Sequence, residues 1–210
     1  MELYVLRHGT TDWNKAHKLQ GRSDIPLDEE GRKLAEEVGK GMKDIHFDMC
    51  FSSPLKRAVE TAELVLEGRG IRIITDPRLL EVGFGDFEGK VCVEGFEGYD
   101  PATADVLRFD DPDRVCPPGG ETLREVQERT RSFYREITED PANEDKRILI
   151  SMHGAAGRAL MQSAWGDETF WHGCVPKNCT VCIVKLTDGK VTSIQQDVAF
   201  YRSAVEDFYR

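Results

Sequence analysis

Residues 3–14, LYVLRHGTTDWN, set the plan of the fold. Residues 3–6 are apolar and have the length and composition of a buried strand, and the run ends abruptly at Arg7, His8 and Gly9. In an open α/β sheet, ligands bind outside the carboxyl ends of the strands. The sequence therefore predicts that Arg7 and His8 lie at a binding edge.

The same order of strand, turn and helix repeats along the chain. Residues 47–51, 71–74 and 147–151 predict further buried strands, and the last of these ends in Met152-His153-Gly154. Apolar positions at helical spacing predict helices within residues 28–45, 54–65, 123–137 and 155–165. Ser53 is expected to cap the second of these helices with Pro54 in its first turn. Thr122 and Glu125 form a capping box ahead of the third.

The C-terminal part of the chain predicts a hairpin. Residues 180–186 and 191–196 have strand composition and flank Asp188-Gly189, a strong signal for a tight turn. Alternating strands and helices followed by this hairpin predict a three-layer α/β/α fold, with a mostly parallel sheet and an antiparallel C-terminal strand. Residues 199–210 fit either a short helix or a tail.

The chain is expected to form one domain over residues 1–210, because it holds no internal repeat and no linker-like tract. Residues 76–120 show no regular pattern, and residues 82–120 are expected to form a lid over the binding edge. We refer to residues 82–120 as the lid segment.

Composition narrows the function and the compartment. The 210 residues are 40% hydrophobic and carry a formal charge of −10, which argues against non-specific binding to nucleic acid or to anionic membranes. No apolar stretch is long enough to cross a bilayer, and Arg7 comes too early for a signal peptide. A cytoplasmic protein is expected, with its six cysteines as reduced thiols.

Four side chains are expected to converge at the predicted binding edge. Arg7, His8, Arg57 and His153 all fall at or just beyond the carboxyl ends of predicted parallel strands. A single histidine at a strand end is more often structural, and an arginine in a first helical turn is usually on the surface. Four such positions together favour a site for a tetrahedral dianion, since arginine offers bidentate, permanently charged donors. The expected ligand group is a phosphate.

Six motifs in order along the chain resemble the histidine phosphatase superfamily, also called phosphoglycerate mutase-like. They are LRHGTTDWN, LQGRSDIPLDEEGRKLA, FSSPLKRAVETA, LLEVGFGDFEG, PPGGET and ISMHG. The resemblance implies that His8 is the nucleophile and that Glu81 is the proton donor. It further implies that Arg7, Arg57 and His153 bind the phosphoryl group, that Asn14 adds a side-chain donor, and that Gln20 and Gly21 lie near the substrate. Thr10 departs from the Glu or Gln that many members carry beside the substrate.

Elementary chemistry agrees with these implied roles. An imidazole attacks phosphorus only when it is neutral, and two nearby arginines disfavour its protonation while they neutralise the phosphoryl oxygens in the transition state. The leaving alkoxide of a phosphomonoester needs a proton, which a carboxyl group such as that of Glu81 can supply.

Other kinds of site are disfavoured by spacing. His172, Cys174, Cys179 and Cys182 suggest a zinc site, but residues three apart on a strand point to opposite faces of the sheet. None of the cysteines has an arginine at the offset of a cysteine-based phosphatase, and no glycine-rich nucleotide loop is present. The expectation is an enzyme that uses neither a metal nor a cofactor.

Three functions follow from the resemblance. The first is a metal-independent phosphomonoesterase that acts on a small phosphate ester through a phosphohistidine; the second is a phosphoglycerate mutase, and the third a non-catalytic phosphate-binding protein. Mutases carry a string of the Arg-His-Tyr-Gly type after the glutamate, whereas here the residues are Val82, Gly83, Phe84 and Gly85. This favours the phosphatase branch, although Lys90 or Arg108 could supply the missing charge.

The substrate is expected to be selected by residues 90–118 of the lid segment. Its large and charged side chains, which either face the pocket or pack the lid, are Phe96, Tyr99, Arg108, Phe109 and Arg114. Neither the substrate nor the oligomeric state follows from the sequence.

Overall fold

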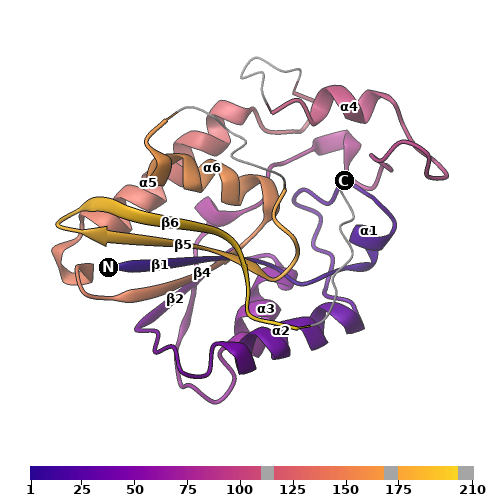
Figure 1. Ribbon diagram of the computed structural model, residues 1–210. Helices are drawn as coiled ribbons and strands as arrows, with labels where there is room; N and C mark the ends of the chain where they lie inside the picture. The colour runs from indigo at the N-terminus through magenta and orange to yellow at the C-terminus, as the bar shows by residue number, and fades with distance from the viewer. Residues whose placement is uncertain (110–115, 168–174, 203–210) are drawn as a thin grey trace.

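The computed structural model describes residues 1–109, 116–167 and 175–202. Six strands form one sheet in the order β3-β2-β4-β1-β5-β6 (Figure 1). In chain order they are β1 (Glu2–Arg7), β2 (Met49–Ser52), β3 (Ile73–Thr75), β4 (Arg147–Met152), β5 (Thr180–Thr187) and β6 (Lys190–Ala199). The first four run parallel to one another, whereas β5 is antiparallel to both β1 and β6. The mostly parallel sheet and the antiparallel C-terminal end are confirmed.

Helices cover both faces of this sheet. Figure 1 shows α5 (Leu123–Glu139) and α6 (Gly154–Trp165) on one face, and α2 (Glu29–Gly41) and α3 (Lys56–Val65) on the other. Alternation along β1 explains the two layers, because Leu3 and Val5 pack into the core beneath α5 and α6, while Tyr4 and Leu6 pack against α2 and α3. The three-layer α/β/α fold is confirmed.

Two local signals have the expected geometry. The Thr122 hydroxyl accepts from the Glu125 N–H at 3.2 Å, and the Glu125 carboxylate accepts from the Thr122 N–H at 2.8 Å, which completes the capping box of α5. Asp188 and Gly189 both have positive φ, 52° and 70°, and they join β5 to β6 as the two-residue loop of a hairpin.

The predicted cap of α3 is wrong. This helix begins at Lys56, with Leu55 at the N-cap and no side-chain cap. The reason is that the Ser53 N–H still donates to the Ser151 carbonyl at 2.9 Å, so the chain continues the sheet ladder one residue past β2. Pro54 therefore precedes the helix.

The segment expected to be irregular contains three short helices. These are the 3₁₀ turns η1 (Pro77–Leu79) and η2 (Gly85–Phe87) and the helix α4 (Ala102–Val106). The Asp100 carboxylate accepts a hydrogen bond from the Ala102 N–H at 3.0 Å, so Asp100-Pro101 marks the start of α4. The helix has only five residues, which is too short for a helical hydrophobic pattern to show in the sequence. Figure 1 shows α4 at the same end of the molecule as α1 (Asp12–Lys15).

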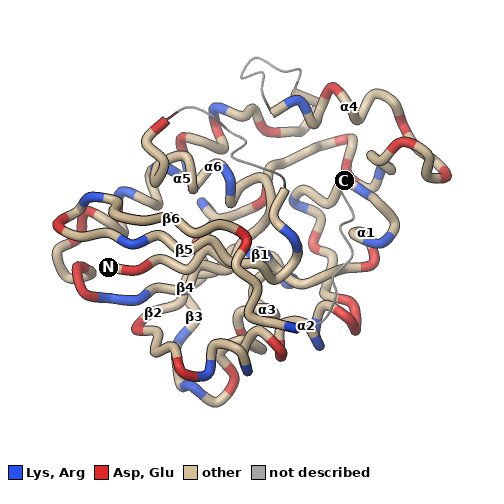
Figure 2. Tube along the Cα trace, in the orientation of Figure 1, with Lys and Arg blue, Asp and Glu red and all other residues tan. Residues whose placement is uncertain are grey.

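The distribution of charge and the lengths of the helices are known for the part of the chain that the structure describes. Acidic and basic residues are interspersed along the trace (Figure 2). None of the helices in the described ranges is long and apolar enough to cross a membrane. Most of the undecided C-terminal segment, residues 203–210, lies outside the described residues.

Candidate active site

Strand register brings the two histidines of the motifs together. Arg7 pairs with Met152 at the end of the β1·β4 ladder, and the His8 N–H donates to the Met152 carbonyl at 3.0 Å. His8 and His153 are thus neighbours one step beyond the sheet. Their ring centroids lie 5.2 Å apart at an interplanar angle of 62°.

The His8 ring is held in one orientation. It is 3% exposed, and Nδ1 lies 2.6 Å from the Gly9 carbonyl oxygen. A carbonyl oxygen can only accept, so Nδ1 carries the ring proton and Nε2 of the neutral ring has a free lone pair. Burial, reinforced by the Arg57 and Arg7 guanidiniums, lowers the pKa of His8 well below its usual value.

The two arginines are also held, mainly by backbone carbonyls. Arg57 is fully buried and donates to Gly21 O at 2.7 Å and to Ser23 O at 2.8 Å. Arg7 donates to the Pro176 carbonyl. Its guanidinium lies against the first turn of α6, where a Cβ on Gly154 would be 3.6 Å from Arg7 Cζ.

One ring nitrogen of His153 is hydrogen-bonded and the other is not. Its Nε2 lies 2.8 Å from Ser53 Oγ, whereas Nδ1 is buried without a hydrogen-bond partner. Burial, Arg57 and His8 lower the pKa of His153 well below its usual value. Ser53, expected to be a helix cap, is therefore a partner of this histidine.

Glu81 is fixed by the N-terminus of α6. Its Oε1 accepts from the N–H groups of Val82 at 2.9 Å and Ala156 at 2.8 Å, while Oε2 accepts a longer bond of 3.3 Å from Ala155. The carboxylate thus satisfies helix N–H groups that His153, at the N-cap, does not cap. The Arg129 guanidinium from α5 supports the Glu81 carbonyl at 3.2 Å.

These side chains surround one cavity of about 500 Å³. The predicted site residues that line it are Arg7, His8, Gln20, Gly21, Arg57 and Glu81. His153 lies beside it through its contact with His8. Gln20 Oε1 is a buried acceptor without a partner, which a donor on a ligand could satisfy.

Besides His153, two residues expected near the substrate do not line this cavity. Asn14 lies in α1, where its Oδ1 accepts from the Thr11 N–H at 3.1 Å and from the Thr11 hydroxyl at 3.0 Å. The buried Thr10 hydroxyl donates to Asp28 Oδ1 at 2.7 Å, at the N-cap of α2. In this structure both side chains order the loop that follows β1.

Sequence reasoning missed the residues that hold the backbone of His8 and Gly9. Asn178 Nδ2 donates to the carbonyls of His8 at 2.9 Å and Gly9 at 3.1 Å, and Thr61 Oγ1 accepts the Gly9 N–H at 3.0 Å. A Cβ on Gly9 would lie 2.6 Å from the Gly31 carbonyl oxygen, which explains the glycine of the Arg-His-Gly motif. Asn178 lies just before a strand, so the strand-end argument could not find it.

Glu88 was missed in the same way. Its carboxylate accepts from the N–H groups of Arg22 and Ser23, both at 2.8 Å, and from the Ser23 hydroxyl at 2.5 Å. Glu88 therefore orders the loop whose carbonyls hold Arg57. Gly21 in this loop has a φ of 53°, and a Cβ there would lie 2.1 Å from Glu88 Oε1.

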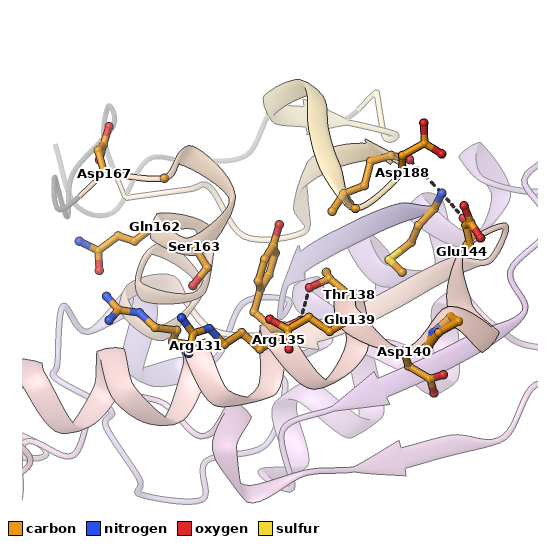
Figure 3. A pocket seen from close by; sticks show the side chains of 16 residues that line it. Arg131, Arg135, Thr138, Glu139, Asp140, Glu144, Gln162, Ser163, Asp167 and Asp188 are labelled. Carbon is orange, nitrogen blue, oxygen red and sulfur yellow. Dashed lines mark hydrogen bonds between the residues drawn. The ribbon is translucent and has the colours of Figure 1, made fainter.

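A larger cavity of about 740 Å³ lies elsewhere, between α5, α6 and the β5–β6 hairpin (Figure 3). It is lined by residues such as Arg131, Arg135, Gln162 and Asp188, and by none of the predicted site residues. The smaller cavity is therefore the candidate active site.

The cysteines do not support the zinc alternative. Cys179 packs in the core with α2 and α3, whereas Cys182 packs in the core with α5 and α6, so the two thiols lie on opposite faces of the sheet. His172 and Cys174 lie outside the described residues. Within the described ranges, no three His, Cys, Asp or Glu side chains are grouped so as to hold a metal ion.

The sequence matches the family profile of the histidine phosphatase superfamily, branch 1, over residues 3–197. The chain belongs to this superfamily. Among its relatives, a protein of Bacillus subtilis strain 168 named "uncharacterized phosphatase PhoE" is 35% identical over 164 residues, which cover 78% of this chain and 77% of that protein.

Other members of the superfamily are similarly close. The 2,3-bisphosphoglycerate-dependent phosphoglycerate mutase of Cytophaga hutchinsonii is 34% identical over 161 residues, covering 76% of this chain and 75% of that protein. The solved structure of YhfR from Bacillus stearothermophilus has a TM-score of 0.80 at 31% identity, with 96% and 98% of the two chains covered. Identity to a phosphatase and to a mutase is nearly equal, so it does not choose between the two activities.

Buried neutral histidines should make stability depend on pH. The pKa values of His8 and His153 are lowered in the folded protein, so below about pH 6.5 the unfolded chain binds more protons than the folded one. We expect the free energy of unfolding to fall as the pH falls from about 6.5 to 5, by up to about 1.4 kcal/mol per pH unit for each histidine. Denaturant titrations in phosphate-free buffers measure this slope.

The slope should be smaller in His8→Asn and His153→Asn. His46, whose side chain is 85% exposed, provides the matched control, and His46→Asn should keep the wild-type slope. Equal slopes in all of these proteins would contradict the assignment of the pH dependence to the buried pair.

Proposed function

We propose that this protein is a phosphomonoesterase that hydrolyses a small phosphorylated metabolite through a phosphohistidine on His8. The observation that carries the proposal is the His8 ring, whose Nδ1–H is held by the Gly9 carbonyl while burial and the neighbouring Arg57 and Arg7 favour its neutral form. Nε2 is then a nucleophile beside two permanent positive charges. A protein that only binds phosphate needs no such nucleophile.

The reaction takes two steps. His8 Nε2 attacks phosphorus, the bond from phosphorus to the ester oxygen breaks, and Glu81 gives its proton to the departing alkoxide. Water then attacks the phosphohistidine, Glu81 takes a proton from it, and the N–P bond breaks to release phosphate. Oε2 of Glu81, which has the longer N–H contact, is the oxygen assigned to carry the proton.

The remaining polar groups bind the phosphoryl oxygens. Arg7 and Arg57 neutralise charge in the transition state without reorganising, because the hydrogen bonds to Pro176, Gly21 and Ser23 already position them. With the Ser53 hydroxyl donating to Nε2, His153 carries its proton on Nδ1 and donates it to a phosphoryl oxygen. These groups supply the positive charge and donors that the reaction needs, so we propose that it requires no metal ion.

Hydrolysis is proposed over phosphoryl return to a second hydroxyl. After Glu81, the side chains of Val82 and Phe84 are buried and apolar, and the Gly83 carbonyl accepts the Glu121 N–H at 2.9 Å. This stretch offers no charge to the carboxylate of a phosphoglycerate. The lid segment is proposed to close the cavity around the ester.

The assay supplies 3-phosphoglycerate and a panel of phosphate esters, with and without chelator and with and without a bisphosphoglycerate primer. We expect phosphate release that chelator does not reduce. Production of 2-phosphoglycerate that outpaces phosphate release from every ester would identify a mutase. Loss of activity on chelation would refute the metal-independent mechanism.

A further inference from the structure

The candidate active site has an apolar wall. Its lining residues are Leu19, Phe84, Val93, Tyr99, Leu107, Phe109 and Val175, most of them from the lid segment. Phe84 and Phe109 are only 5% and 4% exposed, and their rings meet edge to face with centroids 6.5 Å apart. Both belong to the hydrophobic core beneath α5 and α6, so this wall continues a packed core.

Positive charge in the described part of the cavity lining is limited to two side chains; Arg114 lies outside the described residues. Among the described residues that line it, Arg7 and Arg57 are the only lysine or arginine side chains. Lys90 and Arg108 are not in the lining, and Lys90 pairs with Asp100 at 2.8 Å while lying 4.1 Å above the Phe87 ring.

The lining of the same cavity also carries negative charge. Glu94 from the lid segment lines it together with Glu81. Arg22 is not in the lining and is paired with Glu121 at 2.9 Å. A carboxylate or a second phosphate on the alcohol part of a substrate would lose its hydration against apolar side chains, and the described lining offers it no cation besides Arg7 and Arg57.

From this distribution we infer that the enzyme prefers phosphate monoesters whose alcohol part is uncharged and apolar, an alkyl or aryl group, over carboxylated or doubly phosphorylated esters. The inference rests on the proposed phosphomonoesterase activity. The cavity of about 500 Å³ is large enough for such a group beyond the phosphate, since pockets for small molecules measure about 300–1,000 Å³.

A series of unbranched primary alkyl phosphates tests the wall without changing the leaving-group chemistry. We expect kcat/KM to rise about fourfold for each added methylene, which is the factor that burial of one methylene provides. The rise should stop once the alkyl chain of the substrate extends beyond the apolar wall. A matched pair tests the charge: kcat/KM for butyl phosphate should exceed that for 4-phosphonooxybutanoate, which has a carboxylate in place of the terminal methyl group, by about tenfold or more.

Leu107→Lys places a cation in the wall and should reduce the preference for butyl phosphate about tenfold or more. Leu107→Met, which keeps an uncharged side chain of similar volume, should retain a preference for butyl phosphate. A flat alkyl series, or a preference of the wild-type enzyme for the carboxylated ester, would overturn this inference while phosphate release still supports the proposed function. Failure to hydrolyse any ester would refute the proposed function itself.

Discussion

Replacing His8 with alanine is expected to lower kcat about 10⁴-fold or more for every phosphate ester, because the variant lacks the atom proposed to attack phosphorus. The strand register and the Gly9 carbonyl put the lone pair of His8 Nε2 beside Arg7 and Arg57, and no other side chain is placed in the same way among the described residues. His153 does not substitute, since its Nε2 is engaged by Ser53.

Rapid quenching should trap the intermediate on the wild-type protein. We expect an acid-labile, base-stable phosphoryl group on the peptide that contains His8, and none on His8→Ala. The exposed His46 offers a control, since His46→Ala should be phosphorylated as the wild-type protein is. Full turnover by His8→Ala, with its thermal unfolding unchanged, would exclude the phosphohistidine mechanism.

Glu81→Gln is expected to have the second largest effect. Activity on alkyl phosphates should fall by about 10²–10⁴-fold, because the amide cannot give a proton to the alkoxide. The loss on p-nitrophenyl phosphate should be much smaller, since nitrophenolate leaves without a proton. The amide keeps one oxygen to accept from the N–H groups of Ala156 and Val82, so the geometry at the start of α6 should persist.

The ratio of the two losses separates proton donation from binding. Glu97, an exposed carboxylate of the lid segment, is the matched control, and Glu97→Gln should change neither rate. Equal losses of activity on alkyl and p-nitrophenyl phosphate in Glu81→Gln would assign Glu81 to substrate binding.

Local sequence determined most of the strands and helices of this protein. Apolar runs of four to six residues specify β1, β2 and β4, and helical spacing specifies the buried faces of α2, α3, α5 and α6. Because parallel strands present their carboxyl ends at one edge, residues that follow those ends could be predicted to meet. Arg7, His8 and His153 do so.

Tertiary structure decided how these residues are held and what surrounds them. Asn178 reaches His8 across 170 positions of the chain, and Glu88 reaches Ser23 across 65. Neither contact follows from a local pattern, because each depends on where two distant loops meet after the sheet has formed.

The fold also gives Ser53 and Asn14 other partners than the sequence predicted. Ser53 is in reach of His153 because the β2–β4 pairing extends one residue further than the helix-start signal implied, and Asn14 turns to Thr11 because α1 forms a capping box of its own. Polar side chains bind whichever partner the fold brings within hydrogen-bond distance. The residue types at the strand ends thus follow from short segments of sequence, whereas the cavity beside them forms only when the described part of the lid segment packs against those strand ends.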